Sequence, residues 1–271
     1  MAISMPLLLF LTAAVLAACA GCGEEKFTSA WRDREITVDG RYSDWTGPMP
    51  YLDKQSMYVG VRNDDEYLYM LLKTVDLRAQ MKVLRMGLTL WFSPERKGGG
   101  RLGIRYPIGI GNHGIPLFGA EPMRGLSPEQ REKLAESFKE MEILGPEQEK
   151  WTRIARADSS AIQVAVRDTS EVIVYELRVP LQRREGSGWA VGAAPGDRIV
   201  VEAVTGDIRS EKNEVTRSEE THRRETTGKI RDKGRSRDRG RSMEPFAMNP
   251  LAEPIRFRAR VSLASNPSPV R

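Results

Sequence analysis

Cysteine and histidine, which supply many nucleophile–base pairs, are scarce in this chain. The 271 residues include two cysteines, Cys19 and Cys22, and two histidines, His113 and His222. Covalent catalysis needs a nucleophile activated by a neighbouring base, and these four residues offer few such pairs. The sequence contains no Gly-x-Ser-x-Gly elbow, no His-Glu-x-x-His pair and no phosphate-binding glycine loop. We therefore predict that the chain is not an enzyme, with a glycosidase-like pair of carboxylates as an alternative that spacing cannot test.

Four aspartates in predicted turns have the chemistry of metal ligands. Asp39 precedes a glycine, Asp44 precedes a tryptophan, and Asp64 and Asp65 stand in a polar run between two apolar segments. Aspartate favours turns because its carboxylate accepts hydrogen bonds from nearby backbone N–H groups, which gives all four a structural reading. Calcium also takes carboxylate oxygens, so a calcium site that combines Asp64 and Asp65 with Asp39, Asp44 or Asp76 is the second reading, although no EF-hand spacing is present. We expect no cofactor, and calcium stays open as the alternative.

An apolar segment without charged residues, 5–18, precedes Cys19. As a helix, its fourteen residues would rise about 21 Å, less than the hydrocarbon core of about 30 Å, so the segment has the length of a signal-peptide apolar region. Leu16-Ala17-Ala18-Cys19 resembles the lipobox of bacterial lipoproteins. The resemblance implies that Cys19 is acylated, and Ala20 after it implies an outer-membrane anchor facing the periplasm or the cell surface. The alternative is a plain secretory signal, and Cys22 fits the lipobox less well.

The formal net charge of +5 is concentrated in one polar segment. Residues 206–242 hold twelve Lys and Arg against eight Asp and Glu, which gives +4. With so few apolar residues, residues 209–247 cannot bury enough surface to offset their ordering entropy, so we expect a disordered insertion. Its basic half, 223–241, is either a solvated loop or a patch attracted to an anionic surface. No aromatic residue interleaves with these charges, so nucleic acid is not an expected partner.

Short runs of alternating apolar and polar residues recur along the chain, as in half-buried β-strands. The runs 56–62 and 67–74 flank a short polar link and predict a hairpin. Ser127 and Pro128 are typical of a helix start. The predicted fold class is an all-β antiparallel sandwich, immunoglobulin-like or jelly-roll-like, with one short helix near 128–138 and a long disordered loop before the last strand. Further strands are expected at 35–38, 86–92, 102–108, 141–145, 162–167, 172–179, 197–207 and 254–263.

These patterns divide the chain into consecutive parts. We expect a signal peptide at 1–18, a tether at 19–33, one sandwich domain at 34–265 and a short tail at 266–271. The basic insertion 209–247 would then interrupt two strands of the domain, which costs little stability because loop-closure entropy grows slowly with loop length.

Several short motifs resemble family 9 carbohydrate-binding modules and the related DOMON-like domains. They are Ile36-Thr37-Val38-Asp39-Gly40 with Ser43-Asp44-Trp45, Asn63-Asp64-Asp65-Glu66-Tyr67-Leu68-Tyr69, Trp91-Phe92-Ser93-Pro94 and Tyr175-Glu176-Leu177-Arg178-Val179-Pro180-Leu181. The resemblance implies a β-sandwich that binds carbohydrate in some members and haem in others. Trp45 is expected to fill one end of the core, with stacking on a sugar as the alternative. Glu176 is either an outward polar residue or a partnered buried carboxylate.

Carbohydrate binding needs exposed aromatic faces with polar groups nearby. Trp31, Trp151 and Trp189 are the candidates, since none lies in a predicted core strand, and for each the alternative is packing at a strand edge. Haem is the weaker reading, because the ligands on offer are His113 and methionines and no Cys-x-x-Cys-His motif is present. We predict a lipid-anchored, non-catalytic envelope module that binds glycan. The alternatives are a structural or assembly lipoprotein without a small ligand and a haem-binding electron-transfer module.

Overall fold

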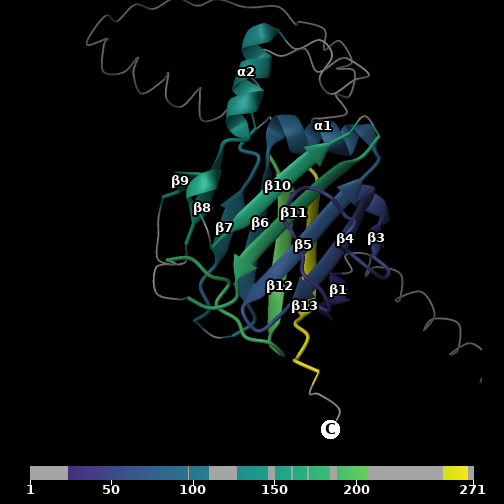
Figure 1. Cartoon of the computed structure of the whole chain (residues 1–271), viewed down its shortest axis with the longest axis vertical. Helices are drawn as coiled ribbons and strands as arrows, with labels where there is room; N and C mark the ends of the chain where they lie inside the picture. The colour runs from purple at the N-terminus through teal and green to yellow at the C-terminus, as the bar shows by residue number, and fades with distance from the viewer. Residues whose placement is uncertain are drawn as a thin grey trace, which may run out of the picture.

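Two β-sheets packed face to face make up the body of the protein (Figure 1). The structure, a computed structural model, describes residues 24–96, 98–109, 127–145, 150–159, 161–169, 171–183, 188–206 and 253–267. Most of the regular secondary structure in these residues is β-strand, and the two sheets enclose a common hydrophobic core. The predicted fold class, an all-β sandwich, is confirmed.

The seven-stranded sheet has the strand order β1-β13-β12-β6-β7-β8-β9 and is antiparallel except for the pairing of β1 with β13. Its central strands alternate, with one set of side chains in the core and the other facing outward. The strands span Glu25–Thr28 (β1), Arg256–Ser262 (β13), Arg198–Thr205 (β12), Leu88–Pro94 (β6), Leu102–Arg105 (β7), Glu140–Leu144 (β8) and Thr152–Ala155 (β9).

The six-stranded sheet has the order β10-β11-β5-β4-β2, and β3 also pairs with β4. The predicted hairpin is confirmed, because β4 and β5 pair antiparallel across the polar turn. Strands β10 and β11 also pair antiparallel. The strands span Gln163–Asp168 (β10), Ile173–Pro180 (β11), Tyr67–Thr74 (β5), Met57–Asn63 (β4), Ala30–Trp31 (β2) and Tyr51–Leu52 (β3).

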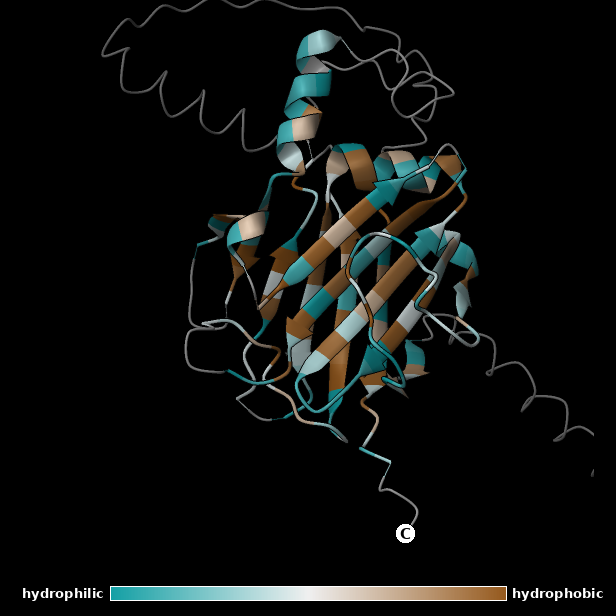
Figure 2. Ribbon diagram, in the orientation of Figure 1, coloured by the Kyte–Doolittle hydropathy of each residue, from teal (hydrophilic) through white to brown (hydrophobic). Residues whose placement is uncertain are grey.

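The core between the sheets is built from alternate residues of these strands, visible as brown bands in Figure 2. Phe92 of β6 and Tyr175 of β11 are among its largest fully buried side chains. On β11 the alternation places Val174 and Glu176 on the opposite, outer face. A single β-strand can serve both surfaces because successive side chains point to opposite sides.

A segment without regular structure, residues 35–50, covers the outer face of the six-stranded sheet. Figure 1 shows it as the purple loop that crosses in front of the sheet. Ile36 and Trp45 are buried there against Tyr69 and Val174, in a second hydrophobic cluster separate from the core between the sheets. The strand predicted at 35–38 is wrong. Its apolar residues are buried by lying across a sheet face, which needs no strand pairing.

Two α-helices lie at one end of the sandwich (Figure 1). Helix α2, Pro128–Ser137, confirms the helix expected near 128–138. Helix α1, Leu77–Met86, corrects the prediction of a single helix. Its first turn is capped by Asp76, which accepts a hydrogen bond from the N–H of Ala79, and its inner side is buried against the core.

The ends of the sandwich domain differ in part from the predicted boundaries. The tether expected at 19–33 is wrong where the structure describes it, because β1 and β2 lie there and pair with β13 and β4. The insertion does fall between paired strands, since β12 and β13 are antiparallel neighbours on either side of it. Residues 209–247 themselves lie outside the described residues, as do 1–23.

Candidate functional site

The outer face of the seven-stranded sheet carries aromatic and charged side chains. In register across four neighbouring strands stand Arg258 of β13, Glu202 of β12, Trp91 of β6 and Gly103 of β7. Trp91 faces outward because its neighbours Leu90 and Phe92 are fully buried on the core side. Because Gly103 has no side chain, the ring of Trp91 can lie close to the backbone there.

Two tryptophans meet over Gly103. Trp151 precedes β9, and its ring lies 5.3 Å from the ring of Trp91, centroid to centroid, with 59° between the planes. A Cβ atom on Gly103 would stand 2.5 Å from Cζ3 of Trp91 and 2.9 Å from Cη2 of Trp151. Both indoles are partly exposed, so the pair forms a tilted aromatic surface that a ligand can reach.

An arginine side chain lies over the ring of each indole. The guanidinium carbon of Arg101 lies 4.0 Å from the ring centroid of Trp91, and that of Arg105 lies 4.6 Å from the ring centroid of Trp151. Such cation–π contacts orient the guanidinium over the ring. A nitrogen of the same guanidinium group of Arg101 pairs with Glu202, which fixes the orientation of the group.

Arg105 is held by a nearly buried carboxylate. The guanidinium of Arg105 donates to Glu142 of β8 at 2.9 Å and to the hydroxyl of Thr89 at 3.3 Å. Arg153 donates to the other carboxylate oxygen of Glu142 at 2.8 Å. The hydrogen bond to Glu142 raises the pKa of Arg153, so this group stays charged at every physiological pH. The site thus presents two indoles beside fixed hydrogen-bond donors and acceptors.

The three tryptophans predicted to bind ligand do not come together. Trp151 is at the surface just described, Trp31 lies in β2 at the edge of the other sheet, and Trp189 packs against the core between the sheets. The prediction missed Trp91, because it assigned the whole run 86–92 to the core. The alternation Leu90-Trp91-Phe92 is the signal that could have placed this ring outward.

Trp45 and Glu176 have one structural role on the covered face. Trp45 is buried, but it packs on the outer face of the six-stranded sheet and not at an end of the core, so both sequence readings of this ring are wrong. Its Nε1 donates to Glu176 at 2.7 Å, and the N–H groups of Gly40 and Asp39 donate to the same carboxylate at 2.7 and 3.0 Å. Glu176 is therefore a partnered buried carboxylate, and burial raises its pKa.

The predicted calcium ligands serve separate turns. Asp64 accepts hydrogen bonds from the N–H groups of Glu66 and Tyr67 at 2.8 and 2.7 Å and forms an ion pair with Arg32. Asp65 accepts from Asn266 at 3.3 Å.

Asp39 and Asp44 accept from backbone N–H groups of their own loop, those of Arg41 and Thr37. Among the residues that the structure describes, no three His, Cys, Asp or Glu side chains gather as metal ligands. The structural reading of the aspartates as turn residues accounts for the contacts they make.

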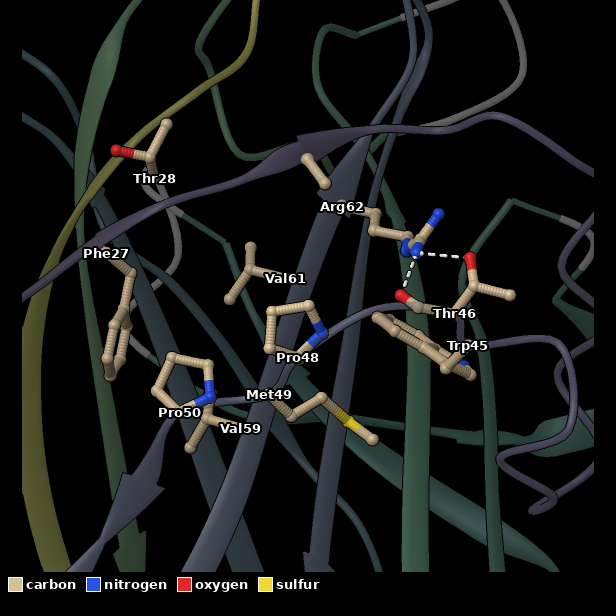
Figure 3. Close-up of a pocket in the computed structure, with 12 residues that line it drawn as sticks. Phe27, Thr28, Trp45, Thr46, Pro48, Met49, Pro50, Val59, Val61 and Arg62 are labelled. Carbon is tan, nitrogen blue, oxygen red and sulfur yellow. Dashed lines mark hydrogen bonds between the residues drawn. The ribbon is translucent and has the colours of Figure 1, made fainter.

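A small pocket lies where the covering segment meets strand β4 (Figure 3). Its walls include Phe27, Met49 and Val61, and Arg62 closes one side through a hydrogen bond of 2.9 Å to the hydroxyl of Thr46. It encloses about 80 Å³, whereas sites for drug-sized ligands span roughly 300–1,000 Å³. We therefore place the candidate site on the open sheet face.

Some predicted residues fall outside the described part of the chain. These are Cys19, His113 and His222, together with the basic residues 223–241. Acylation, haem ligation and attraction to an anionic surface stay predictions. Among the described residues, no helix has both the length and the apolar character needed to cross a membrane.

Comparisons with known proteins found similarity only at the level of solved structures. No family model matches the chain, and no curated protein matches it. A family 9 carbohydrate-binding module from Caldicellulosiruptor kristjanssonii in complex with cellotriose is 11% identical, with a TM-score of 0.33 over 67% of this chain and 76% of that one. The same kind of module in complex with glucose is 9% identical, with a TM-score of 0.32 over 67% and 78%. TM-scores this low carry no argument about what this chain binds.

Proposed function

We propose that the chain is a non-catalytic module that binds carbohydrate on the outer face of the seven-stranded sheet. The observation that carries the proposal is the meeting of Trp91 and Trp151 over Gly103. Aromatic rings combine a large apolar face with geometric rigidity, which suits them to stack on the C–H face of a sugar ring. Because the two planes are inclined by 59°, a sugar that stacks on one ring meets the edge of the other.

The polar groups around the indoles supply the second requirement of a sugar site. Sugar hydroxyls donate and accept hydrogen bonds, so a site for them needs both kinds of partner within reach. Arg101 and Arg105 offer donors, and Glu202 and Glu142 offer acceptors, on the strands that flank the tryptophans. These groups hold one another in place, which lowers the entropy lost on binding.

Binding to a glycan array tests this proposal. We expect Trp91→Ala and Trp151→Ala each to weaken glycan binding about tenfold or more, since truncation of a central aromatic residue costs at least about 1.4 kcal/mol at such interfaces. Trp31→Ala is the matched control, because it removes a partly exposed indole from the other sheet. Glycan binding that survives both site variants, or that is lost in the control alone, contradicts the proposed site.

We also propose that the module is anchored to the bacterial cell envelope through an acylated Cys19. The lipobox-like run Leu16-Ala17-Ala18-Cys19 after an apolar segment supports this part. Labelling of growing cells with a fatty-acid analogue should mark the wild-type protein and leave Cys19→Ser unmarked. Cys22→Ser is the matched control and should keep the label. A labelled Cys19→Ser protein would show that the anchor is elsewhere.

A further inference from the structure

We infer that the carbohydrate bound at the Trp91–Trp151 surface carries carboxylate groups, as the uronic-acid polysaccharides do. This inference rests on the proposed function and narrows it to a chemical class. It comes from the way in which charged residues are layered on the outer face of the seven-stranded sheet.

On this face the arginine of each ion pair is more exposed to solvent than the glutamate. In the pair Arg101–Glu202 the side chains are 47% and 27% exposed, and in Arg105–Glu142 they are 37% and 11% exposed. The same order holds for the other ion pairs that the described residues form here, Arg153–Glu142, Arg153–Glu140, Arg198–Glu95, Arg258–Glu24, Arg258–Glu202, Arg260–Glu24 and Arg260–Glu95. Although the two kinds of charge nearly balance in number, the layer that meets solvent is positive.

Elsewhere in the protein the order of the two charges varies. In the pair Arg62–Asp33, at the edge of the six-stranded sheet, the arginine side chain is 8% exposed and the aspartate 54%. The order of the two charges is reversed there. In Arg32–Asp64 and Arg41–Asp39 the arginine is the more exposed partner, as on the seven-stranded sheet. What distinguishes this sheet is the gathering of many such pairs around its two tryptophans.

The glutamates beneath hold the guanidinium groups in fixed positions. Glu142 binds both Arg105 and Arg153, and Glu202 binds both Arg101 and Arg258. A guanidinium carries five N–H donors in one plane, so a group held from below by one carboxylate retains donors for a second. Planar pairing with a carboxylate is the geometry that arginine matches best.

The arginines nearest to the indoles determine what kind of anion fits. Arg101 and Arg105 lie 4.0 and 4.6 Å from the ring centroids of Trp91 and Trp151, so an anion bound to them is beside an aromatic face. A pyranose ring that bears a carboxylate contacts both groups at once, with its C–H groups against the exposed part of an indole and its charge on the guanidinium. A lipid head group or free phosphate would use the charge and leave the indoles without a role.

The test measures binding of the full mature chain to oligogalacturonate and to the same oligosaccharide fully methyl-esterified. We expect the acid form to bind at least about tenfold more tightly, as one charge-assisted hydrogen bond of about 1.5 kcal/mol requires. Salt should reduce this preference, because screening weakens interactions between exposed charges. The double variant Arg101→Gln, Arg105→Gln should reduce the preference to about twofold or less.

Arg41→Gln is the control for a change in net charge, because Arg41 is 60% exposed on the segment that covers the opposite sheet and its loss removes one positive charge, as each site substitution does. This variant should keep the full preference. Equal or tighter binding of the ester overturns the inference and leaves carbohydrate binding intact, whereas binding of neither oligosaccharide or of any array glycan overturns the proposed function as well. Binding to anionic vesicles that needs Arg101 and tolerates Trp91→Ala would assign the surface to a membrane and also overturn the inference.

Discussion

The two outer faces of the sandwich use the same kinds of residue in different ways, since one face is covered and the other is open. Each face has a glutamate in the middle of a strand, Glu176 on β11 and Glu202 on β12, and each has an indole beside it. On the six-stranded sheet the indole, Trp45, comes from the segment 35–50 and lies over the strands. On the seven-stranded sheet Trp91 comes from the sheet itself, and arginines surround it.

The partners of the two glutamates account for the difference. Glu176 accepts from Trp45, Gly40 and Asp39, all of which belong to the covering segment, so the buried carboxylate ties that segment to the sheet. Glu202 is bound by Arg101 and Arg258, whose long side chains extend past it into solvent. Neutral donors from a covering loop close one face, whereas charged donors from the strands keep the other open.

The matched substitutions Glu176→Gln and Glu202→Gln separate the two roles most strongly. Glutamine has one acceptor oxygen, so at Glu176 its amide group would face an N–H donor, and we expect a loss of about 1–3 kcal/mol in the free energy of unfolding. At Glu202, which stays in contact with water, we expect a change within about 0.5 kcal/mol. Urea denaturation measures both. Equal losses at the two positions would mean that the open face contributes to stability as much as the covered one.

The pH dependence of the free energy of unfolding, compared between wild type and Glu176→Gln, reports the charge of Glu176. Burial raises its pKa above the ordinary 4.5, so between these two values the folded state holds a proton that the unfolded state has released. The stability of wild type relative to Glu176→Gln should therefore fall as the pH rises above about 4.5, and level off above the raised pKa. A relative stability that grows with pH would show that the three donors, and not burial, dominate the pKa of this carboxylate.

The sequence predicts the parts of this fold whose signals are local. The alternation in β4 and β5 and the polar turn between them are enough to place the hairpin. Ser127 and Pro128 mark the start of α2 in the same way. Helix α1 carries a comparable signal, since Asp76 caps it and Val83 and Leu84 face the core, yet it was missed beside stronger strand patterns.

The arrangement of the candidate site depends on long-range register. Trp91 and Gly103 come together only because β6 and β7 pair in one register, and Trp151 reaches them from beyond β8. The bond between Trp45 and Glu176 joins residues 131 positions apart. No periodicity of the sequence records such contacts, so Trp151 could be predicted as a candidate by its type but not placed beside Trp91.

Substitution of one glycine on each face gives the sharpest test of the comparison. Gly60 lies under Trp45, where an added Cβ would stand 2.9 Å from two ring atoms, and Gly103 lies under Trp91 and Trp151 at 2.5 and 2.9 Å. We expect Gly60→Ala to lower the free energy of unfolding by about 1–3 kcal/mol, because Trp45 is buried and is held in place by its hydrogen bond to Glu176. Gly103→Ala should change stability by less than about 0.5 kcal/mol, because the partly exposed indoles can turn outward.

The spectroscopic consequence of the two glycine substitutions is the reverse of the thermodynamic one. The ring centroids of Trp91 and Trp151 lie 5.3 Å apart. At this distance the electronic transitions of the two indoles couple and give a paired signal in the circular dichroism spectrum. Gly103→Ala separates the rings and should abolish that signal, while Gly60→Ala, which acts on the other face, should preserve it in the folded protein. If Gly103→Ala instead destabilises the protein as much as Gly60→Ala does, the tryptophans are packed too firmly to receive a ligand, and the open face is a structural one.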